Sequence, residues 1–290
     1  MTMHFFNPSY SGHAFFEAQS TYENAQAVIY GMPMDWTTSF RPGSRFGPTR
    51  IREVSINLED YSPYADRELK EVAYFDAGDI PLPFGSAHRS LEEIESYVRK
   101  VVADGKFPIG LGGEHLVSLA PIKVMAEKYP DLVIVHIDAH TDLRHEMEGE
   151  QLSHSAIIRR ALDYVKPENV YQFGIRSGLK EEFDYARDNM HLYKFEVVEP
   201  LKKCLDELKG RPVYVTFDID AVDPAFAPGT GTAEPGGITS AEAIEAIYLL
   251  AQLNVVGFDL VEVAPVLDQS ERTQILASKL IREVILTMVK

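Results

Sequence analysis

The stretch LVIVHIDAHTD, residues 132–142, starts with five residues that are nearly all apolar and ends with acidic and imidazole side chains at every second position. Such an apolar run predicts a buried strand of a parallel sheet, because both faces of that kind of sheet are covered. Residues two apart in an extended segment point to the same side, so Asp138, His140 and Asp142 would converge on one point. The stretch therefore predicts a strand that carries a polar site at its carboxyl end.

Similar apolar runs ending in small or acidic residues recur along the chain. They occupy residues 27–35, 107–115, 132–140, 170–177, 213–220 and 255–265. Segments with helical spacing lie between them, at residues 90–105, 119–130, 240–253 and 278–289. Ser90 with Glu93 has the form of a capping box, and Ser240 with Glu242 gives a similar acidic first turn. The alternation predicts an α/β fold, a three-layer α/β/α sandwich with a mostly parallel central sheet, in which ligands bind at the carboxyl ends of the strands.

The composition is that of a globular chain and argues against a nucleic-acid or anionic-membrane binder. No linker, repeat or low-complexity tract divides the chain, so we expect a single domain over residues 1–290. The 44 acidic and 28 basic residues give a formal charge of -16, which is the wrong sign for a nucleic-acid or anionic-membrane partner. This balance favours a cationic small molecule or a metal as the partner.

Cysteine usage and the N-terminus indicate a cytoplasmic protein. Cys204 is the only cysteine, so neither an intramolecular disulfide nor a thiolate metal cluster can form. Residues 1–16 lack the basic start and apolar core of a signal peptide, and no later run approaches the length of a membrane span. We therefore expect a soluble chain in the cytoplasm.

Three predicted strand ends carry residues with metal-ligand chemistry. VTFDIDAVDP (215–224) repeats the acidic alternation of residues 138–142, and GLGGEH (110–115) adds a histidine on a turn. Gly112 and Gly113 in that turn would let the backbone approach the bound group closely. The six candidate metal ligands are His115, Asp138, His140, Asp142, Asp218 and Asp220.

Four carboxylates placed this close together would raise one another's pKa and repel unless cations lay between them. Their charge balances two divalent ions, so we expect a dinuclear centre. Oxygen-rich ligation with one imidazole per metal is typical of Mn²⁺, with Fe²⁺, Co²⁺ and Zn²⁺ as alternatives, and disfavours Ca²⁺ and Mg²⁺. A single Asp-x-His is usually a hydrogen-bonded pair, but two acidic strand ends together with the GGEH turn favour metal binding. His136, one pleat deeper in its strand, is interpreted as a buried, hydrogen-bonded histidine rather than a seventh ligand.

The sequence resembles the ureohydrolase family, which includes arginases and agmatinases. The resemblance depends on an ordered set of motifs: GMPMDWTTSFRPGSRFGPTRIR (31–52), GGEH (112–115), DAHTD (138–142), DIDAVDP (218–224) and VEVAP (261–265). It implies a parallel central sheet, two Mn²⁺ ions and hydrolysis of a guanidino group to urea and an amine by a metal-bridging hydroxide. It also suggests a homo-oligomer, either a trimer or a hexamer.

Carried over motif by motif, the resemblance assigns the metal-ligand role to the same six residues. It further implies that Asp142 holds the bridging hydroxide by a hydrogen bond. Glu262 would face the substrate guanidinium. His154, in LSHSAI, resembles the family's histidine beyond DAHTD, which would contact the substrate and carry a proton to the departing amine.

The segment LRHEMEGEQLSHS (143–155) bears on the choice of guanidino substrate. Glu146, Glu148 and Glu150 would repel a carboxylate and tolerate a terminal ammonium, which favours agmatine, hydrolysed to putrescine and urea. The whole motif set also looks more like that of agmatinases. Arg144 favours instead a substrate with a carboxylate, such as 4-guanidinobutyrate. The alternative for all four charges is that they are solvated and have no role in specificity.

Three other functions compete with this interpretation. Another ureohydrolase, a guanidinobutyrase or an arginase, would share the same metal centre. A two-metal phosphoesterase would need basic side chains near the metals, where the motif loops hold mainly Arg144 and Arg176. A non-catalytic scaffold of the same fold would be favoured by the loss of a ligand, and all six are present. The residues that hold the distal end of the substrate have no sequence signal of their own.

Overall fold

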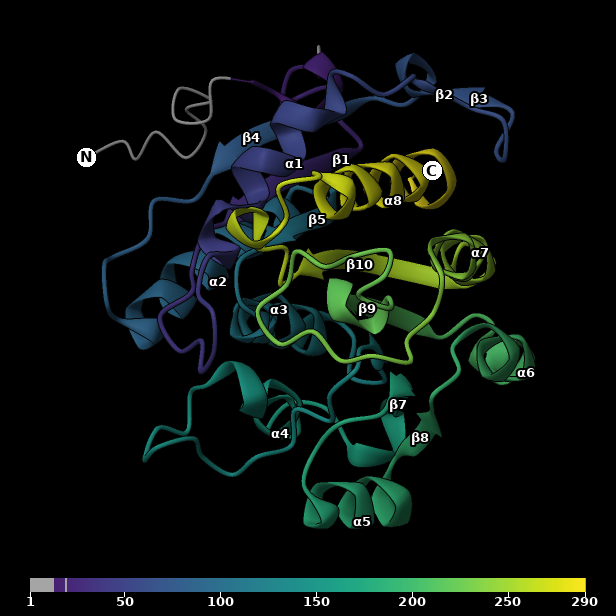
Figure 1. Cartoon of the computed structure of the whole chain (residues 1–290). Coiled ribbons are helices and arrows are strands. Elements are labelled where there is room, and N and C mark those ends of the chain that lie inside the picture. Colours follow the sequence, from purple (N-terminus) through teal and green to yellow (C-terminus); the bar gives the residue numbers. More distant parts are fainter. Residues whose placement is uncertain (1–12, 19, 290) are drawn as a thin grey trace.

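The computed structural model describes residues 13–18 and 20–289 and has an eight-stranded sheet at its centre (Figure 1). The strands are β1 (Ala27–Met32), β4 (Tyr74–Asp79), β5 (Phe107–Gly112), β6 (Val133–Ile137), β7 (Val170–Ile175), β8 (His191–Lys194), β9 (Pro212–Asp218) and β10 (Asn254–Val261). They lie in the order β4-β1-β5-β10-β9-β6-β7-β8, and every neighbouring pair runs parallel. A separate antiparallel hairpin joins β2 (Tyr61–Ser62) to β3 (Arg67–Glu68).

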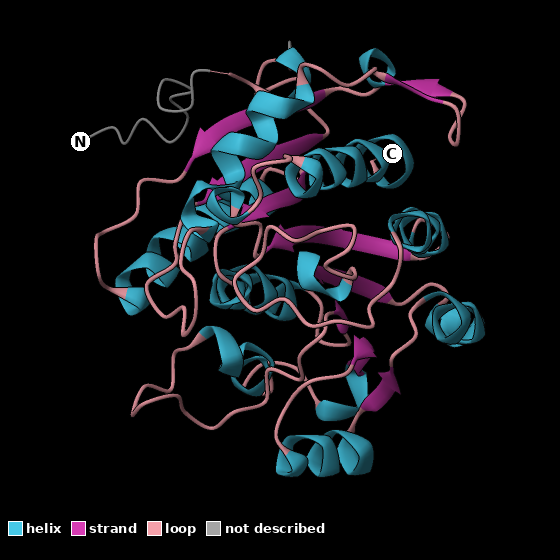
Figure 2. Cartoon of the chain, viewed as in Figure 1, coloured by secondary structure: helices cyan, strands magenta, loops and turns pink. Residues whose placement is uncertain are grey.

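Helices cover both faces of this sheet (Figure 2). They are α1 (Gly47–Ser55), α2 (Ala87–Ala103), α3 (Leu119–Lys128), α4 (Ile157–Ala161), α5 (Lys180–Asn189), α6 (Val198–Leu208), α7 (Ser240–Leu250) and α8 (Arg272–Met288). The apolar core on one face includes side chains of α1, α6, α7 and α8, and the core on the other face includes side chains of α2 to α5. The predicted three-layer α/β/α sandwich with a parallel sheet is confirmed.

Short 3₁₀ turns connect many of these elements. They are η2 (Phe15–Glu17), η3 (Ser44–Phe46), η4 (Leu69–Glu71), η5 (His115–Ser118), η6 (His154–Ala156), η7 (Pro167–Asn169), η8 (Ile219–Ala221) and η9 (Pro265–Leu267). Three of them, η5, η6 and η8, carry side chains of the candidate site. No helix among the described residues is long and apolar enough to cross a membrane. Residues 1–12, which include most of the N-terminal stretch used in the signal-peptide prediction, lie outside the described residues.

The predicted N-terminus of the helix at residues 90–105 is wrong. Helix α2 begins at Ala87, and its N-cap is Ser86, whose hydroxyl accepts a hydrogen bond from the Arg89 backbone N–H. Ser90 is buried inside the helix and donates to the Pro83 carbonyl, so it does not cap. In α7 the capping box pairs Glu242 with Thr239, one residue before the serine that the sequence suggested.

The strand order decides where the site forms. Strands β5, β10, β9 and β6 are consecutive neighbours at the middle of the sheet. Since all four run parallel, the segments that follow them leave the same edge of the sheet. These are the segments that carry the GGEH, VEVAP, DIDAVDP and DAHTD motifs.

Candidate metal centre and substrate cavity

The six residues predicted as metal ligands lie together at the carboxyl edge of the sheet. His115 follows β5, Asp138, His140 and Asp142 follow β6, and Asp218 and Asp220 lie at and just beyond the end of β9. All are buried except His140, whose side chain is partly exposed. The period-two spacing of the motifs and the parallel strand order thus bring four carboxylates and two imidazoles to one place.

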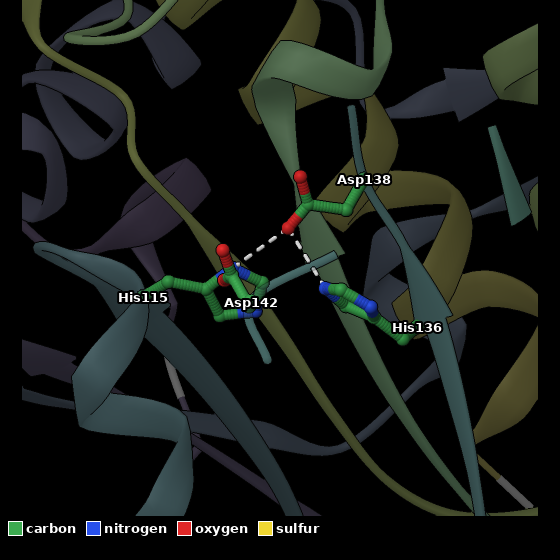
Figure 3. A group of neighbouring side chains, drawn as sticks. All are labelled: His115, His136, Asp138 and Asp142. Atoms are coloured by element: carbon green, nitrogen blue, oxygen red, sulfur yellow. Dashed lines mark hydrogen bonds and ion pairs between the residues drawn. The ribbon is translucent and has the colours of Figure 1, made fainter. Parts of the chain in front are cut away.

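His115 belongs to one group of side chains, of which Figure 3 shows His115, His136, Asp138 and Asp142. Its Nδ1 atom lies 3.0 Å from Oδ2 of Asp138 and 3.2 Å from Oδ2 of both Asp142 and Asp218. Ligand atoms of His115, His136, Asp138 and Asp142 all lie within 4.8 Å of one another. This spacing is short enough for one cation to contact several of them.

Asp138 connects this group to a second one. Nδ1 of His140 lies 3.0 Å from Oδ2 of Asp220 and 3.5 Å from Oδ1 of Asp138, and the three residues offer ligand atoms within 4.8 Å of one another. Asp138 therefore directs Oδ2 toward His115 and Oδ1 toward His140. A carboxylate shared in this way could bridge two ions.

The environment of His115 supports metal binding independently of the motif. Its Nδ1 atom is buried and forms no hydrogen bond with any of the described residues, although three carboxylate oxygens lie within 3.2 Å. A buried polar atom without a partner is costly, and a cation would satisfy the nitrogen and the carboxylates together. The donor set of imidazoles and carboxylates suits Mn²⁺ and related ions. The chain thus holds a His/Asp cluster able to bind metal.

The electrostatics of the cluster also favour cations. Burial, with the added charges of Asp220 and Asp138, raises the pKa of Asp218 well above its usual value. Burial and Asp138 likewise raise the pKa of Asp220. Burial lowers the pKa of His115, but the surrounding carboxylates, Asp138 first, outweigh it and raise that pKa well above normal. Protons and metal ions would therefore compete for this cluster.

His136 is fully buried, and both of its ring nitrogens are hydrogen-bonded. The Gln172 side-chain amide donates to Nδ1 at 3.0 Å and also to the Thr141 carbonyl, which fixes the orientation of the amide. Nδ1 is then an acceptor, so Nε2 carries the hydrogen and donates to Asp138 at 2.8 Å. His136 is thus buried and hydrogen-bonded as expected, although it offers a ligand atom to the first group of side chains. Its hydrogen bond would hold Asp138 in orientation.

A chain of buried side chains lies behind His115. Its Nε2 atom is 2.9 Å from the Thr216 hydroxyl, which donates to Asp259 Oδ1 at 2.7 Å. The Thr216 hydroxyl has one hydrogen, and its 2.7 Å contact with the Asp259 carboxylate is shorter than its 3.2 Å contact with the Ser118 hydroxyl. The hydrogen therefore lies toward Asp259, and Thr216 accepts from Nε2–H of His115. The lone pair of the ring is then on Nδ1, toward the carboxylates. The sequence analysis did not single out Thr216 and Asp259, because they lie inside apolar strands and belong to no recognisable motif.

Two residues at the site have left-handed backbone. Asp142 has φ +51° and Glu262 has φ +62°, in a region that side chains other than glycine rarely adopt. Such conformations concentrate at functional sites, where the surrounding structure holds them. At Glu262 the surrounding contacts are hydrogen bonds: its N–H donates to the Gly113 carbonyl and its Oε1 accepts from the His115 N–H, both at 2.8 Å.

The glycines of the GGEH turn allow the chain to pack closely against itself. A Cβ on Gly113 would lie 1.9 Å from the Met34 carbonyl oxygen, and one on Gly112 would meet Val261. The close approach that the structure shows for these glycines is to the chain's own backbone and to β10. The two glycines let the turn pack between the segment after β1 and strand β10. This packing fixes the position of His115.

A cavity of about 280 Å³ opens over the cluster. Its lining includes His115, Asp142, Asp218, Glu262 and His154. His154 is buried, and its Nδ1 lies 3.5 Å from Oε1 of Glu262. Burial lowers the pKa of His154, but the Glu262 carboxylate outweighs it and raises that pKa above its usual value. Both residues that the resemblance placed beside the substrate therefore face the same space as the metal cluster.

The segment after β1 holds His154 from the side opposite Glu262. The Ser39 backbone N–H donates to Nε2 of His154 at 3.3 Å, and the Ser39 hydroxyl lies 3.0 Å from the same atom. Thr37 accepts from the His154 N–H and donates, through its own N–H and hydroxyl, to the buried carboxylate of Glu114. Burial raises the pKa of Glu114 to about 7, with the Glu262 charge adding to it. The GGEH motif thus contributes a second functional residue, Glu114, which our reading of the motif missed.

The segment 143–155 contributes to the cavity differently from the expectation. Arg144 and Met147 line the cavity, whereas Glu146, Glu148 and Glu150 are exposed and lie outside the lining. Apart from Asp142, Asp218 and Glu262, the acidic residue on the described lining is Glu182 of α5, which has no sequence signal.

Arg176, the other basic residue of the motif loops, forms hydrogen bonds with backbone carbonyl groups. Its guanidinium donates to carbonyl oxygens of Asp220, Ala221 and Glu234. Arg144 is thus the one Lys or Arg side chain on the described cavity lining, which disfavours a phosphate substrate.

Comparison with known proteins gives a consistent result. The Arginase family model matches residues 25–287. The chain is 64% identical over 288 residues to an agmatinase from Bacillus anthracis, and 61% identical over 288 residues to an agmatinase from Bacillus subtilis, covering 98% of this chain and 99% of the relative in both cases. The solved structure of an agmatine ureohydrolase from Thermoplasma volcanium superimposes with a TM-score of 0.87 at 33% identity, covering 97% of this chain and 95% of that one.

Proposed function

The chain belongs to the arginase family and is an enzyme of the amidinohydrolase type, and on that premise we propose that it hydrolyses agmatine to putrescine and urea. The observation that carries the proposal is the cavity in which Glu262 and His154 face the His/Asp cluster. The agmatinases that it resembles along nearly its whole length support the choice of agmatine.

We propose that the metals are two Mn²⁺ ions. His115, Asp138, Asp142 and Asp218 would hold one ion, and Asp138, His140 and Asp220 would contribute to the other. When bound, the ions supply a shared water of lowered pKa, so that hydroxide is available near neutral pH. Asp142, which lines the cavity, would orient that water by accepting its hydrogen bond.

The substrate guanidinium would lie against Glu262. One oxygen of this carboxylate accepts from the His115 backbone, so its position relative to the cluster is fixed. An ion pair with Glu262 holds the cation without coordinating it, which places the guanidinium carbon next to the attacking water. The buried, acidic cavity also favours cationic substrates over anionic ones.

His154 would move the proton that the leaving amine needs. A backbone amide can only donate, so the Ser39 N–H makes Nε2 the acceptor of the neutral ring and leaves the hydrogen on Nδ1. Nδ1 is the atom beside Glu262, and thus beside the bound guanidinium. Water that adds to the guanidinium carbon gives up one proton. The imidazolium form of His154 would donate its Nδ1 proton to the nitrogen attached to the alkyl chain, and the C–N bond would break as the remaining hydroxyl proton is lost, which releases urea and the amine. The proton given up by the water would then restore the imidazolium.

A substrate panel assayed for urea tests this proposal. With Mn²⁺ supplied, the purified protein should show a kcat/KM for agmatine at least about a hundredfold above that for arginine, because a buried acidic cavity disfavours the arginine carboxylate. Asp138→Ala protein, prepared in parallel, provides the background rate. Equal rates for the two substrates would contradict the assignment to agmatine while leaving the family unchanged.

Arg144 favours one other substrate. Its guanidinium lines the cavity and could pair with the carboxylate of 4-guanidinobutyrate. The same panel decides this alternative, because urea released from 4-guanidinobutyrate but not from agmatine would establish it.

The proposal includes the assembly and location of the enzyme. We propose a single-domain chain that forms a homo-oligomer, a trimer or a hexamer, in the cytoplasm. Sedimentation of the purified protein at several concentrations would measure the oligomeric state.

A further inference from the structure

Glu182 is a buried carboxylate on the cavity lining with no assigned role. It lies in the first turn of α5, and its side chain is 5% exposed, whereas its neighbour Glu181 is exposed. Its Oε2 accepts a hydrogen bond from the Leu179 backbone N–H at 2.5 Å, which fixes the start of the helix. One carboxylate of α5 is thus held at the cavity while the next points to solvent.

The cavity has a buried end and an open end, and Glu182, although itself buried, lies three residues after Leu179, which is at the open end. His115 and Glu262 at the buried end are 1% and 3% exposed. Leu179, which precedes the helix and also lines the cavity, is 39% exposed. A linear substrate whose guanidinium lies on Glu262 would extend its other end toward Leu179 and Glu182.

The charge of Glu182 has no ion-pair partner among the described residues. Burial raises its pKa above the usual value, and the charge of Asp142 adds to this effect. The hydrogen bond from the Leu179 backbone, the charge of Arg144 and a hydrogen bond from the Thr141 side chain act in the opposite direction but do not outweigh burial, and Arg144 acts only through space. Burying a carboxylate without a paired cation is unfavourable, so a cation that entered the cavity would be stabilised there.

We propose that Glu182 binds the terminal ammonium of the substrate and so selects agmatine over guanidino compounds with a neutral or anionic tail. This inference rests on the proposed function. An ammonium at the open end would pair with Glu182, which has no other cation in contact. A carboxylate tail would pair with Arg144 but would be repelled by Glu182 beside it.

The test compares two substrates that differ only at this end. Agmatine carries the ammonium, and butylguanidine is the same alkylguanidine without it. Glu182→Gln keeps the size of the side chain and an oxygen that can accept from the Leu179 N–H, but removes the charge. Glu181→Gln removes a carboxylate one residue away that does not line the cavity, and serves as the matched control.

In Glu182→Gln we expect kcat/KM for agmatine to fall at least about tenfold, mainly through KM, because a desolvated ion pair is lost. The kcat/KM for butylguanidine should change by less than about twofold, since that substrate has no charge to lose. Glu181→Gln should match the wild type with both substrates. If Glu182→Gln does not fold, Glu182→Asp replaces it, with KM for agmatine again rising and KM for butylguanidine unchanged.

An equal loss with both substrates would overturn the inference, because it would mean that Glu182 only positions the helix. No loss with either substrate would overturn it as well, by showing that the carboxylate does not meet the ammonium. A wild-type protein that releases no urea from agmatine would instead refute the proposed function itself, and the two failures are therefore distinguishable.

Discussion

Ser39 offers His154 a partner in both protonation states of the imidazole. Its backbone N–H donates to Nε2 of the neutral ring at 3.3 Å, and its hydroxyl oxygen, 3.0 Å from the same atom, can accept from Nε2–H once the ring is protonated. A group that must gain and lose a proton in each reaction cycle benefits from a neighbour that satisfies both forms. Ser39 thus connects the segment after β1 to the proton transfer that we propose for His154.

The pH dependence of activity should respond to this contact. If His154 donates its proton, activity falls as the pH rises through its pKa, which Glu262 holds above the usual 6.5. Ser39→Ala removes the acceptor of the protonated ring, so the pKa of His154 should fall and the alkaline limb of kcat/KM should move to lower pH. Activity well below that limb should change little.

The control for this prediction is Ser155→Ala, since Ser155 lines the same cavity but has its side-chain hydrogen bond with Ser153. A profile for Ser39→Ala that superimposes on that of Ser155→Ala would contradict the assignment of the limb to His154.

Metal content should distinguish ligands from neighbouring residues. The wild-type protein should bind two Mn²⁺ per chain by elemental analysis after dialysis. Asp138→Ala should lose both ions, because Asp138 belongs to both groups of side chains, while Asp220→Ala should retain one. His136→Asn should retain two and lose thermal stability instead, because both of its nitrogens are hydrogen-bonded.

Asp223 provides the control for these metal measurements. It is the last carboxylate of DIDAVDP, but it accepts hydrogen bonds from the backbone of Ala225 and Gly236. Asp223→Asn should bind two ions. Two ions retained by Asp138→Ala would show that the ligand set is wrong.

The hydrogen bonds from His115 through Thr216 to Asp259 should affect metal affinity. Thr216→Val keeps the shape of the side chain but removes the oxygen that accepts from His115 Nε2. Loss of such a partner of a ligating histidine typically weakens metal binding about ten- to a hundredfold. Ser118→Ala is the comparison, because the Ser118 hydroxyl is hydrogen-bonded to Thr216 at 3.2 Å and so lies one step further from the ring. Mn²⁺ affinities measured by calorimetry should differ between the two variants, and equal affinities would remove Thr216 from the metal centre.

Stability at low pH should depend on a buried carboxylate far from the site. Glu283 of α8 is buried, which raises its pKa, but hydrogen bonds from Ser62, Tyr248 and Arg282 outweigh burial and lower the pKa below 4.5. A pKa lowered by folding gives stability that is present at neutral pH and is lost as the pH falls through the folded-state pKa.

Glu283→Gln should therefore lower the free energy of unfolding by about 1–3 kcal/mol at pH 7, and the difference should shrink below about pH 4.5. Glu245→Gln, which removes a half-exposed surface ion pair with Lys202, should cost less than about 1 kcal/mol. Denaturant unfolding at pH 7 and pH 4 measures both. A gap for Glu283→Gln that persists unchanged at low pH would contradict the assigned linkage.

The six cluster residues were predictable because their position follows from two local rules. Side chains alternate along an extended segment, and parallel strands end at one edge of a sheet, so DAHTD and DIDAVDP had to meet if their strands were neighbours. Strand order itself carries no such local signal. The family resemblance, rather than the pattern, provided Glu262 and His154.

Elements that contain charged residues were harder to predict. Strand β4 reads YFDAGD, and its Asp76 looks like a loop residue until Arg52 of α1, fully buried, is seen to donate to it at 2.8 Å. The partner lies 24 residues away, so the local sequence cannot reveal that the charge is neutralised. The same holds for Glu182, which reaches the cavity only because the turn after β7 packs beside the loop after β6.

The hydrogen bond from the His115 N–H to Glu262 has a consequence for protein engineering. Glu262, which we propose binds the substrate guanidinium, also accepts a hydrogen bond from the loop that carries His115. A substitution at Glu262 would therefore change both substrate binding and the position of a metal-site histidine. The far end of the cavity, where α5 and the 143–155 segment meet the solvent, is free of that constraint. Substitutions intended to change substrate specificity should therefore be made in α5 and the 143–155 segment rather than at Glu262 and the metal cluster.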